Sequence, residues 1–358
     1  MFWKPVVGKR EYRGDSMRTI ELLLGGIIIV STLVDIFQSV VVPRPTRGSL
    51  RLAPLLLDGM WPLWKWIALR FPSAKHSASL LGIYAPLTVV VLLLVWAIAL
   101  IFGYGLLFLA LQGALQPRLH DLGTVLYFAE TSLLTIGFGD IVATGGITRV
   151  LALCAGASGL VIASSVISMF FSLYSSLGHR EVLVRMLHNR AGAPPSGVTL
   201  LETYARLKML EDLPGFLSAW EEWSTEVLIG SLSYPVLPYF RSVRPYESWI
   251  SALGALLDAA TLIISCIEDG PAGPAHLLYQ SGCQLVNDLK DYFKIAPAQA
   301  QTGTPRRSFE AAYTRLKSAG FCLAEPEPAW TSFIELRSAY EEALHSLTKY
   351  WVVSQRKF

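Results

Sequence analysis

Three long apolar stretches occupy the first half of this chain, and the second half has the polar and apolar spacing of soluble helices. The stretches are Ile20–Val42, Leu80–Leu111 and Ile147–Leu177. Each is long enough to cross a hydrocarbon core of about 30 Å, since a helix rises about 1.5 Å per residue. The pattern therefore predicts an all-α membrane protein whose membrane part precedes a soluble part.

The segment Leu50–Phe71 is also apolar, but charged residues interrupt it. Arg51, Asp58 and Lys65 recur every seven residues, a spacing that lines them along one helix face. Three tryptophans lie nearby, and tryptophan favours the headgroup level of a bilayer. We predict an amphipathic helix lying in the membrane interface. The alternative is a fourth span, which would move the N-terminus from the outside to the inside.

From Val198 to the end, helical periodicity predominates. The expected helices cover 198–212, 214–232, 246–268, 273–293, 305–319 and 328–352. The most apolar stretch, Trp249–Ile267, has Asp258 at its middle, and a carboxylate there is costly in lipid. We therefore expect it to be a buried bundle helix. The predicted organisation is an N-terminal part with the first span (1–79), a pore module (80–178), a linker (179–196) and a cytoplasmic helical domain (197–358).

Composition agrees with a membrane protein and excludes other classes. Hydrophobic residues make up 53% of the 358 residues and charged residues only 16%, against about a quarter charged in soluble domains. A net charge of +3 gives no case for nucleic-acid binding. The four cysteines lack metal-ligand spacing, and no nucleophile–base motif accompanies the six scattered histidines, so neither a metal cofactor nor an enzyme is expected.

The candidate chemistry lies between the second and third apolar stretches. Asp121–Leu134 is too short to cross a membrane, and Thr135-Ile136-Gly137-Phe138-Gly139-Asp140 follows it. A K⁺ ion in a narrow pore must exchange its water for protein oxygens, which successive backbone carbonyls supply if they point at one axis. That arrangement needs alternating ordinary and left-handed backbone, and glycine reaches positive φ without steric cost. We expect Ile136 and Phe138 to point away from the axis and Asp140 to mark the outer mouth.

The six residues match the potassium-channel pattern Thr-Val/Ile-Gly-Tyr/Phe-Gly-Asp at every position, in the order span, short helix, filter, span. The chain thus resembles the potassium channel superfamily. The resemblance implies a selectivity filter at 135–139 that binds K⁺ through Thr135, Ile136, Gly137 and Phe138. It also implies a homotetramer in the lipid bilayer of the plasma membrane, with Leu122–Leu134 as the pore helix and the C-terminal domain in the cytoplasm.

Two positions depart from the family pattern. Some members carry a carboxylate that hydrogen-bonds the outer Asp, but here that position is Thr131, with Glu130 beside it, and Leu134 replaces a frequent Thr. Glu130, Thr131 and Ser132 remain the candidates for filter support. A weakly selective cation channel is therefore an alternative. A signalling or scaffold protein with a non-conducting filter is another.

The third apolar stretch is expected to line the inner pore. Gly159 lies 20 residues after Gly139, where resembling channels carry a gating-hinge glycine, and Gly156 precedes it by about one turn. Both glycines are compatible with a hinge or with close helix packing. Ser164 and Ser165, with Ser168, are candidate cavity-facing hydroxyls.

No segment has Arg or Lys at every third position, so a conventional voltage sensor is not expected. Asp35 in the first span is either functional or paired with Arg44 or another helix. The second half lacks the Gly-x-Gly-x-x-Gly motif of a dinucleotide-binding domain. Its stretch Leu232–Ser242 is similar to a little-characterised group of prokaryotic ion-channel-domain proteins with a helical C-terminal domain. That resemblance implies no particular ligand, and an unknown cytoplasmic ligand or partner is left open.

Overall fold

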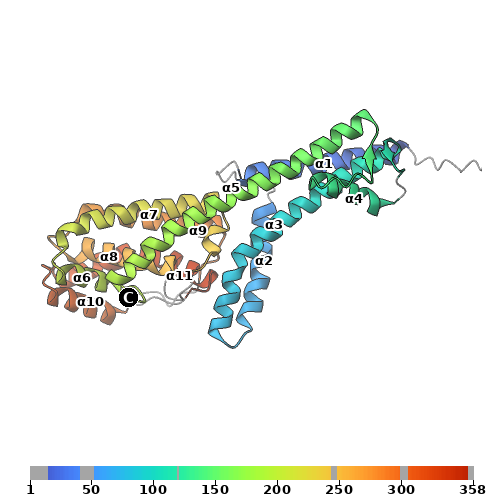
Figure 1. Cartoon of the computed structure of the whole chain (residues 1–358). Coiled ribbons are helices and arrows are strands. Elements are labelled where there is room, and N and C mark those ends of the chain that lie inside the picture. The colour runs from blue at the N-terminus through green and yellow to red at the C-terminus, as the bar shows by residue number, and fades with distance from the viewer. Residues whose placement is uncertain (1–14, 41–51, 119–120, 243–247, 299–304, 354–358) are drawn as a thin grey trace, which may run out of the picture. The chain divides into compact units, whose positions relative to one another are not determined.

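The computed structural model describes residues 15–40, 52–118, 121–242, 248–298 and 305–353 (Figure 1). The expectations about the N-terminal tail before residue 15 and about Arg44 and Arg51 lie outside these residues. The chain divides into two units. Of the described residues, unit 1 contains 15–40, 52–56, 89–118 and 121–171, and unit 2 contains 57–88, 172–242, 248–298 and 305–353.

The elements belonging wholly or partly to unit 1 are α1 (Asp15–Val40), α2 (Leu52–Leu69), α3 (Ala74–Ala110), the 3₁₀ turn η1 (Gln112–Ala114), β1 (Leu115–Gln116), α4 (Leu122–Leu133), β2 (Val142–Ala143) and α5 (Gly146–Ala191). Helices α2, α3 and α5 are continuous and contribute residues to both units.

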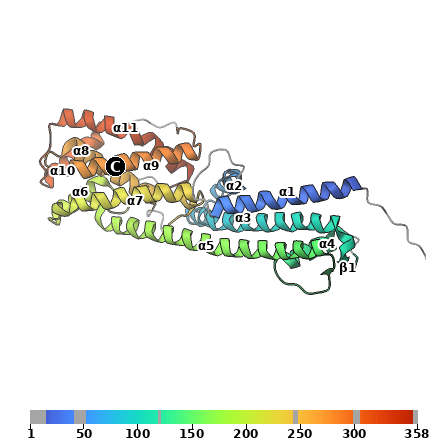
Figure 2. The same ribbon diagram turned by 90° about the horizontal axis from the view of Figure 1, so that it is seen from above.

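In unit 1, α1 runs antiparallel to α3 (Figure 2). At one end Arg18 Nε donates to the carbonyl oxygen of Ala110 at 3.1 Å. At the other end Trp96 Nε1 donates to Asp35 Oδ2 at 2.6 Å. Between these contacts the helices approach so closely that a Cβ on Gly25 would lie 2.7 Å from the Gly103 carbonyl oxygen. Small residues allow such backbone approach, which is how helices associate in lipid.

The segment between α3 and α5 is closed by a short antiparallel ladder. β1 pairs with β2, with Leu115 opposite Ala143 and Gln116 opposite Val142. The amide of Thr144 donates to the Ala114 carbonyl at 2.9 Å. The ladder therefore brings together the two ends of the segment that contains α4 and the filter loop.

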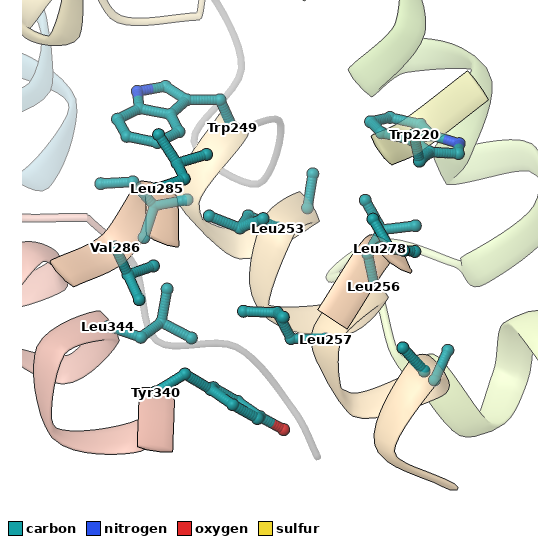
Figure 3. Packing of buried hydrophobic residues seen from close by; sticks show 14 of the residues in the cluster. Trp220, Trp249, Leu253, Leu256, Leu257, Leu278, Leu285, Val286, Tyr340 and Leu344 are labelled. Carbon is teal, nitrogen blue, oxygen red and sulfur yellow. The ribbon is translucent and has the colours of Figure 1, made fainter. Parts of the chain in front are cut away.

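Unit 2 contains the C-terminal helical bundle. Its remaining elements are α6 (Gly197–Arg206), η2 (Leu210–Asp212), α7 (Leu213–Ser233), η3 (Leu237–Tyr239), α8 (Trp249–Cys266), α9 (Ala272–Tyr292), α10 (Arg306–Ser318) and α11 (Pro326–Tyr350). Helix α8 is the core of the bundle. Figure 3 shows its side chains Leu253 and Leu257 packed among Leu285 of α9 and Tyr340 of α11. The six helical segments predicted after Val198 are confirmed in order, with ends that differ by a few residues and a first segment split into α6 and η2.

Four described helices are long and apolar enough to cross a membrane: α1, α3, α5 and α8. In α8, 94% of the most apolar stretch is buried inside the protein, which agrees with the predicted bundle helix. Asp258 in this helix accepts hydrogen bonds from Arg337 Nη1 and the Tyr340 hydroxyl, each at 2.8 Å. Helix α2 is not among the four, so the alternative of a fourth span at 50–71 gains no support.

Two boundaries differ from the expected ones. Helix α5 continues to Ala191, so most of the expected linker at 179–196 is helical. Its Val184 and Leu187 are buried in the bundle core, and the helix ends just before Pro194 and Pro195, which cannot continue it. Residues 57–88 also belong to unit 2, not to an N-terminal part.

The amphipathic helix predicted at 50–71 exists as α2, but its buried face contacts protein. Leu57, Trp61 and Ala68 are buried in the bundle core of unit 2. Leu63 and Trp66 on the same helix are 62% and 54% exposed. The seven-residue spacing of charges could not reveal the protein partner of the buried face, and the position of α2 in a membrane interface stays a prediction.

Candidate ion-conduction site

Helix α4 leads directly into the filter loop. Asp121 caps its N-terminus, accepting the Thr124 amide at 2.7 Å, as is common at helix starts. Phe128 packs against Phe108 of α3 in an edge contact at 4.8 Å between ring centroids. The last residue before the loop is Leu134, which was predicted to be part of this helix and instead forms its C-terminal cap.

The filter backbone alternates between left-handed and ordinary conformations. The φ angles of Thr135, Gly137 and Gly139 are +55°, +57° and +81°, and these are the only positive values from 52 to 118 and 121 to 191. The two glycines meet the expectation. Positive φ at Thr135 was not expected, because a β-branched residue rarely adopts it, and such strain persists where the surrounding structure holds it.

Hydrogen bonds attach this loop to the end of α4. The amides of Ile136 and Gly137 donate to the Thr131 carbonyl at 2.9 and 3.4 Å. The amide of Thr135 donates to the Ser132 carbonyl at 3.2 Å. The strained backbone at Thr135 is thus held on both sides, and the Thr131 and Ser132 carbonyl groups accept the amides of residues 135–137.

The Phe138–Asp140 end of the loop approaches α4 at Tyr127, a residue that was not predicted to belong to the site. The Tyr127 hydroxyl lies near enough to the Asp140 carboxylate to interact with it electrostatically, and the Tyr127 ring stacks parallel to Phe138 with centroids 6.4 Å apart. The Thr131 hydroxyl bonds the Phe128 carbonyl instead, and the Glu130 side chain is exposed. The available signal was the four-residue spacing of Tyr127 and Thr131, which puts both on one face of α4.

Helix α5 packs closely against the end of α4. A Cβ on Gly159 would lie 1.8 Å from the Leu133 carbonyl oxygen, and one on Gly156 would lie 3.4 Å from that of Ser132. Helix α5 runs through both positions without interruption. These glycines were compatible with close helix packing or with a hinge. The short distances to the end of α4 support close packing, and a hinge stays a prediction.

Similarity to known proteins identifies this region. Residues 85–176 match the family model described as an ion channel. This segment is an ion channel domain. It extends from within α3 through α4 and the filter loop into α5. All the filter, support and inner-helix residues predicted from the sequence lie inside it.

The chain is also similar to an uncharacterized membrane protein, YdjJ, of Bacillus subtilis (strain 168), with 21% identity over 203 residues. The match covers 56% of this chain and 58% of that protein, so the chain spans little more than half of its relative. No solved structure gives a significant match. The protein is accordingly a membrane protein with an ion channel domain.

Side chains that were expected to point away from the pore axis or toward a cavity are exposed or half-buried in the single chain. Ile136 and Phe138 are 49% and 68% exposed. Ser164 is exposed and Ser165 is half-buried on α5. Their predicted orientations, away from the pore axis for the first pair and toward a cavity for the second, concern an assembly of chains and stay predictions.

Outside the channel domain, the carboxylate of Asp35 has defined partners. Its Oδ2 accepts Trp96 Nε1, and its Oδ1 accepts the amide of Leu52 at 3.0 Å. Leu52 begins α2, and a carboxylate at a helix N-terminus is stabilised by the helix dipole. Of the two alternatives, pairing with another helix therefore accounts for the buried position of Asp35.

Proposed function

We propose that this chain is one subunit of a homotetrameric, potassium-selective channel of the plasma membrane. It passes K⁺ down its electrochemical gradient, has no conventional voltage sensor, and is regulated by its C-terminal helical bundle. The observation that carries the proposal is positive φ at Thr135, Gly137 and Gly139 within a complete Thr-Ile-Gly-Phe-Gly-Asp sequence.

Alternating backbone handedness turns successive carbonyl groups toward one side of a loop. A ring of such carbonyls, together with the Thr135 hydroxyl, replaces the water around a K⁺ ion. One chain has one such loop, so four chains must surround a common axis to complete the ion sites. The carbonyl end of α4 carries a partial negative charge that favours a cation near the loop.

The direction of the helices follows from the same proposal. If α4 enters the membrane from outside, α3 runs outward and α5 returns to the cytoplasm. The contact of Arg18 with Ala110 supports an outside position for the start of α1, because α1 and α3 are antiparallel. The C-terminal bundle is then cytoplasmic.

Replacing Gly137 with Ala tests the proposal. No atom lies within 4 Å of a Cβ added there, so the effect comes from backbone conformation and not from a clash. Left-handed backbone costs an L-residue about 1–2 kcal/mol, and four subunits share the change. We expect K⁺ flux into liposomes to fall by about tenfold or more.

The matched control is Gly146→Ala, which also has open space around its Cβ but no positive φ. It should leave the flux unchanged. Selective K⁺ flux that persists unaltered in the Gly137→Ala protein would contradict the assignment of the filter.

A weakly selective cation channel is the second candidate. It is favoured by Leu134, which is 51% exposed next to Thr135, and by Thr131 in place of a carboxylate. Reversal potentials in mixed sodium and potassium distinguish the two functions. A potential near the potassium equilibrium value supports selectivity, and one near zero supports the second candidate.

A further inference from the structure

A short connection in unit 2 is buried like a core element. It is the segment Tyr234–Arg241 between α7 and α8, called here the junction segment, and it includes the 3₁₀ turn η3. Leu237, Pro238 and Tyr239 are all buried, although connections usually lie on the surface. Its burial arises from three groups of contacts, each with a different part of the unit.

The first group joins the junction segment to α5. Arg180 of α5 is only 3% exposed. Its Nη1 donates to the Leu237 carbonyl at 3.3 Å and its Nη2 to the Phe240 carbonyl at 2.9 Å. The guanidinium is a rigid fork, so two simultaneous bonds fix both its position and its orientation. Glu181 Oε1, at 3.3 Å from Nη2, partly balances the charge.

The second group joins the same segment to α2 and α3. The Tyr239 ring meets Trp61 of α2 edge-on at 5.1 Å and Tyr84 of α3 at 5.3 Å between centroids. The Tyr84 hydroxyl donates to the Leu57 carbonyl at 2.8 Å, and Trp64 Nε1 donates to the Leu80 carbonyl at 2.9 Å. Residues 57–88 therefore form a helical hairpin held against the junction segment.

The third group joins the segment to the end of α11. Arg241 Nη2 donates to the carbonyls of Trp351 and Val352. The Tyr239 hydroxyl lies 3.1 Å from that of Tyr350. Burial lowers the pKa of Arg241 to about 10, because desolvation disfavours its charged form, and the negative end of α11 partly offsets this cost.

We propose that the junction segment couples the C-terminal bundle to both helices that flank the filter, with Arg180 as the positioning residue. The inference rests on the proposed function and deepens it by naming its regulatory connection. Helices α3 and α5 are continuous from unit 2 into the channel domain, and one eight-residue segment contacts the unit 2 part of each. A displacement of the segment therefore moves two pore helices together.

Amide hydrogen exchange of the full-length protein tests the coupling without requiring conduction. In Arg180→Gln the junction segment loses both charged bonds to α5. We expect exchange to accelerate by about tenfold in residues 234–241 and also in residues 57–88. Residues 57–88 contact the junction segment through Tyr239 and not through Arg180. Faster exchange confined to α5 and residues 234–241 would show a local structural role and overturn the proposal.

Two further variants complete the exchange experiment. Arg185→Gln removes the same charge from an exposed position on the same helix, and it should leave exchange in 57–88 unchanged. Arg180→Lys keeps the charge without the forked geometry and replaces the Gln variant if the latter does not fold. It should show the same pattern at smaller amplitude, and unchanged exchange in 57–88 would again overturn the proposal.

Flux measurements separate this proposal from the proposed function. For Arg180→Gln we expect K⁺ flux per tetramer to change by about fivefold or more, a typical coupling between sites, with an unaltered ratio of K⁺ to Na⁺ permeability. If the wild type conducts and Arg180→Gln conducts identically, the coupling is wrong and the channel function stands. If the wild type does not conduct, the function fails, and the exchange pattern alone decides the coupling.

Discussion

Helices α5 and α8 are both long and apolar enough to cross a membrane, yet the protein covers them very differently. Of the most apolar stretch of each, 11% is buried in α5 and 94% in α8. Apolar surface that its own chain does not cover must be covered by lipid or by other subunits. Length and composition therefore identify a candidate span, and the packing partners decide what the helix is used for.

The two helices also differ in what lies at their closest contacts. At Gly159, α5 contacts the backbone of Leu133 at the end of α4. At Asp258, α8 meets an arginine and a tyrosine of α11. The contact at Gly159 leaves no room for a methyl group. At Asp258, hydrogen bonds from Arg337 and Tyr340 replace the water that a buried carboxylate loses. Substitutions at the two positions should consequently fail in different ways.

The largest effect is expected at Gly159 of α5. Ala at this position would place its Cβ 1.8 Å from the Leu133 carbonyl oxygen, and backbone cannot move aside without displacing the filter. We expect Gly159→Ala to abolish K⁺ flux and to reduce the yield of assembled protein in size-exclusion chromatography. Gly178→Ala on the same helix, with nothing within 4 Å of its Cβ, is the control. Normal flux in Gly159→Ala would mean that the helices are not this close.

A smaller effect is expected at Asp258 of α8. Asp258→Asn removes the buried partner of Arg337 and leaves it only the partly exposed Glu341, at 3.1 Å, and breaking a buried pair in this way costs up to about 3–5 kcal/mol. We expect the melting temperature of the bundle to fall by about 10 °C, as followed by circular dichroism. Asp269→Asn, at an exposed position just after α8, should change it little.

The double variant Asp258→Leu with Arg337→Met sharpens this test. Replacing a whole buried ion pair by apolar residues is often close to neutral. The double variant should therefore melt at a higher temperature than Asp258→Asn. A lower melting temperature would show that the hydrogen bonds of the pair, and not the weakened compensation of the Arg337 charge, determine stability.

The smallest effect is expected at Asp35 of α1, in unit 1. Its donors, Trp96 Nε1 and the Leu52 amide, are neutral, and Asn keeps one oxygen acceptor. We expect Asp35→Asn to cost about 1–2 kcal/mol, the range for a lost hydrogen bond, measured as a small decrease in melting temperature in detergent. Ser31→Ala on an exposed position of α1 is the control. A loss as large as that of Asp258→Asn would indicate a charged partner for Asp35.

Much of the candidate site was predictable because its chemistry is local. Positive φ at Gly137 and Gly139 follows from the need for left-handed backbone, which glycine meets without strain. Positive φ at Thr135 was not predictable, since a β-branched residue adopts it only when neighbouring hydrogen bonds hold it there. The proximity of Tyr127 to Asp140 was not predicted, because the family pattern places the partner of the outer Asp at the position of Thr131.

The extent of α5 and the packing partner of α2 could not be predicted for a similar reason. The composition of 179–196 indicates a linker, but burial of Val184 and Leu187 against the bundle keeps α5 helical to Ala191. The amphipathic pattern of 50–71 was correct, yet a pattern shows only that one face is apolar. The identity of the surface opposite that face, here Tyr84 and Tyr239 near Trp61, is a property of residues far apart in the chain.

The sequence by itself determined the apolar stretches, the helical second half and the two-glycine loop, because hydrophobic length and access to positive φ belong to neighbouring residues. Only the tertiary structure decided that α8 is enclosed by protein, that Asp35 and Asp258 have different donors, and that residues 57–88 and α5 meet at Tyr234–Arg241. Each of these depends on which distant side chains exclude water from a given surface, and no short segment carries that information.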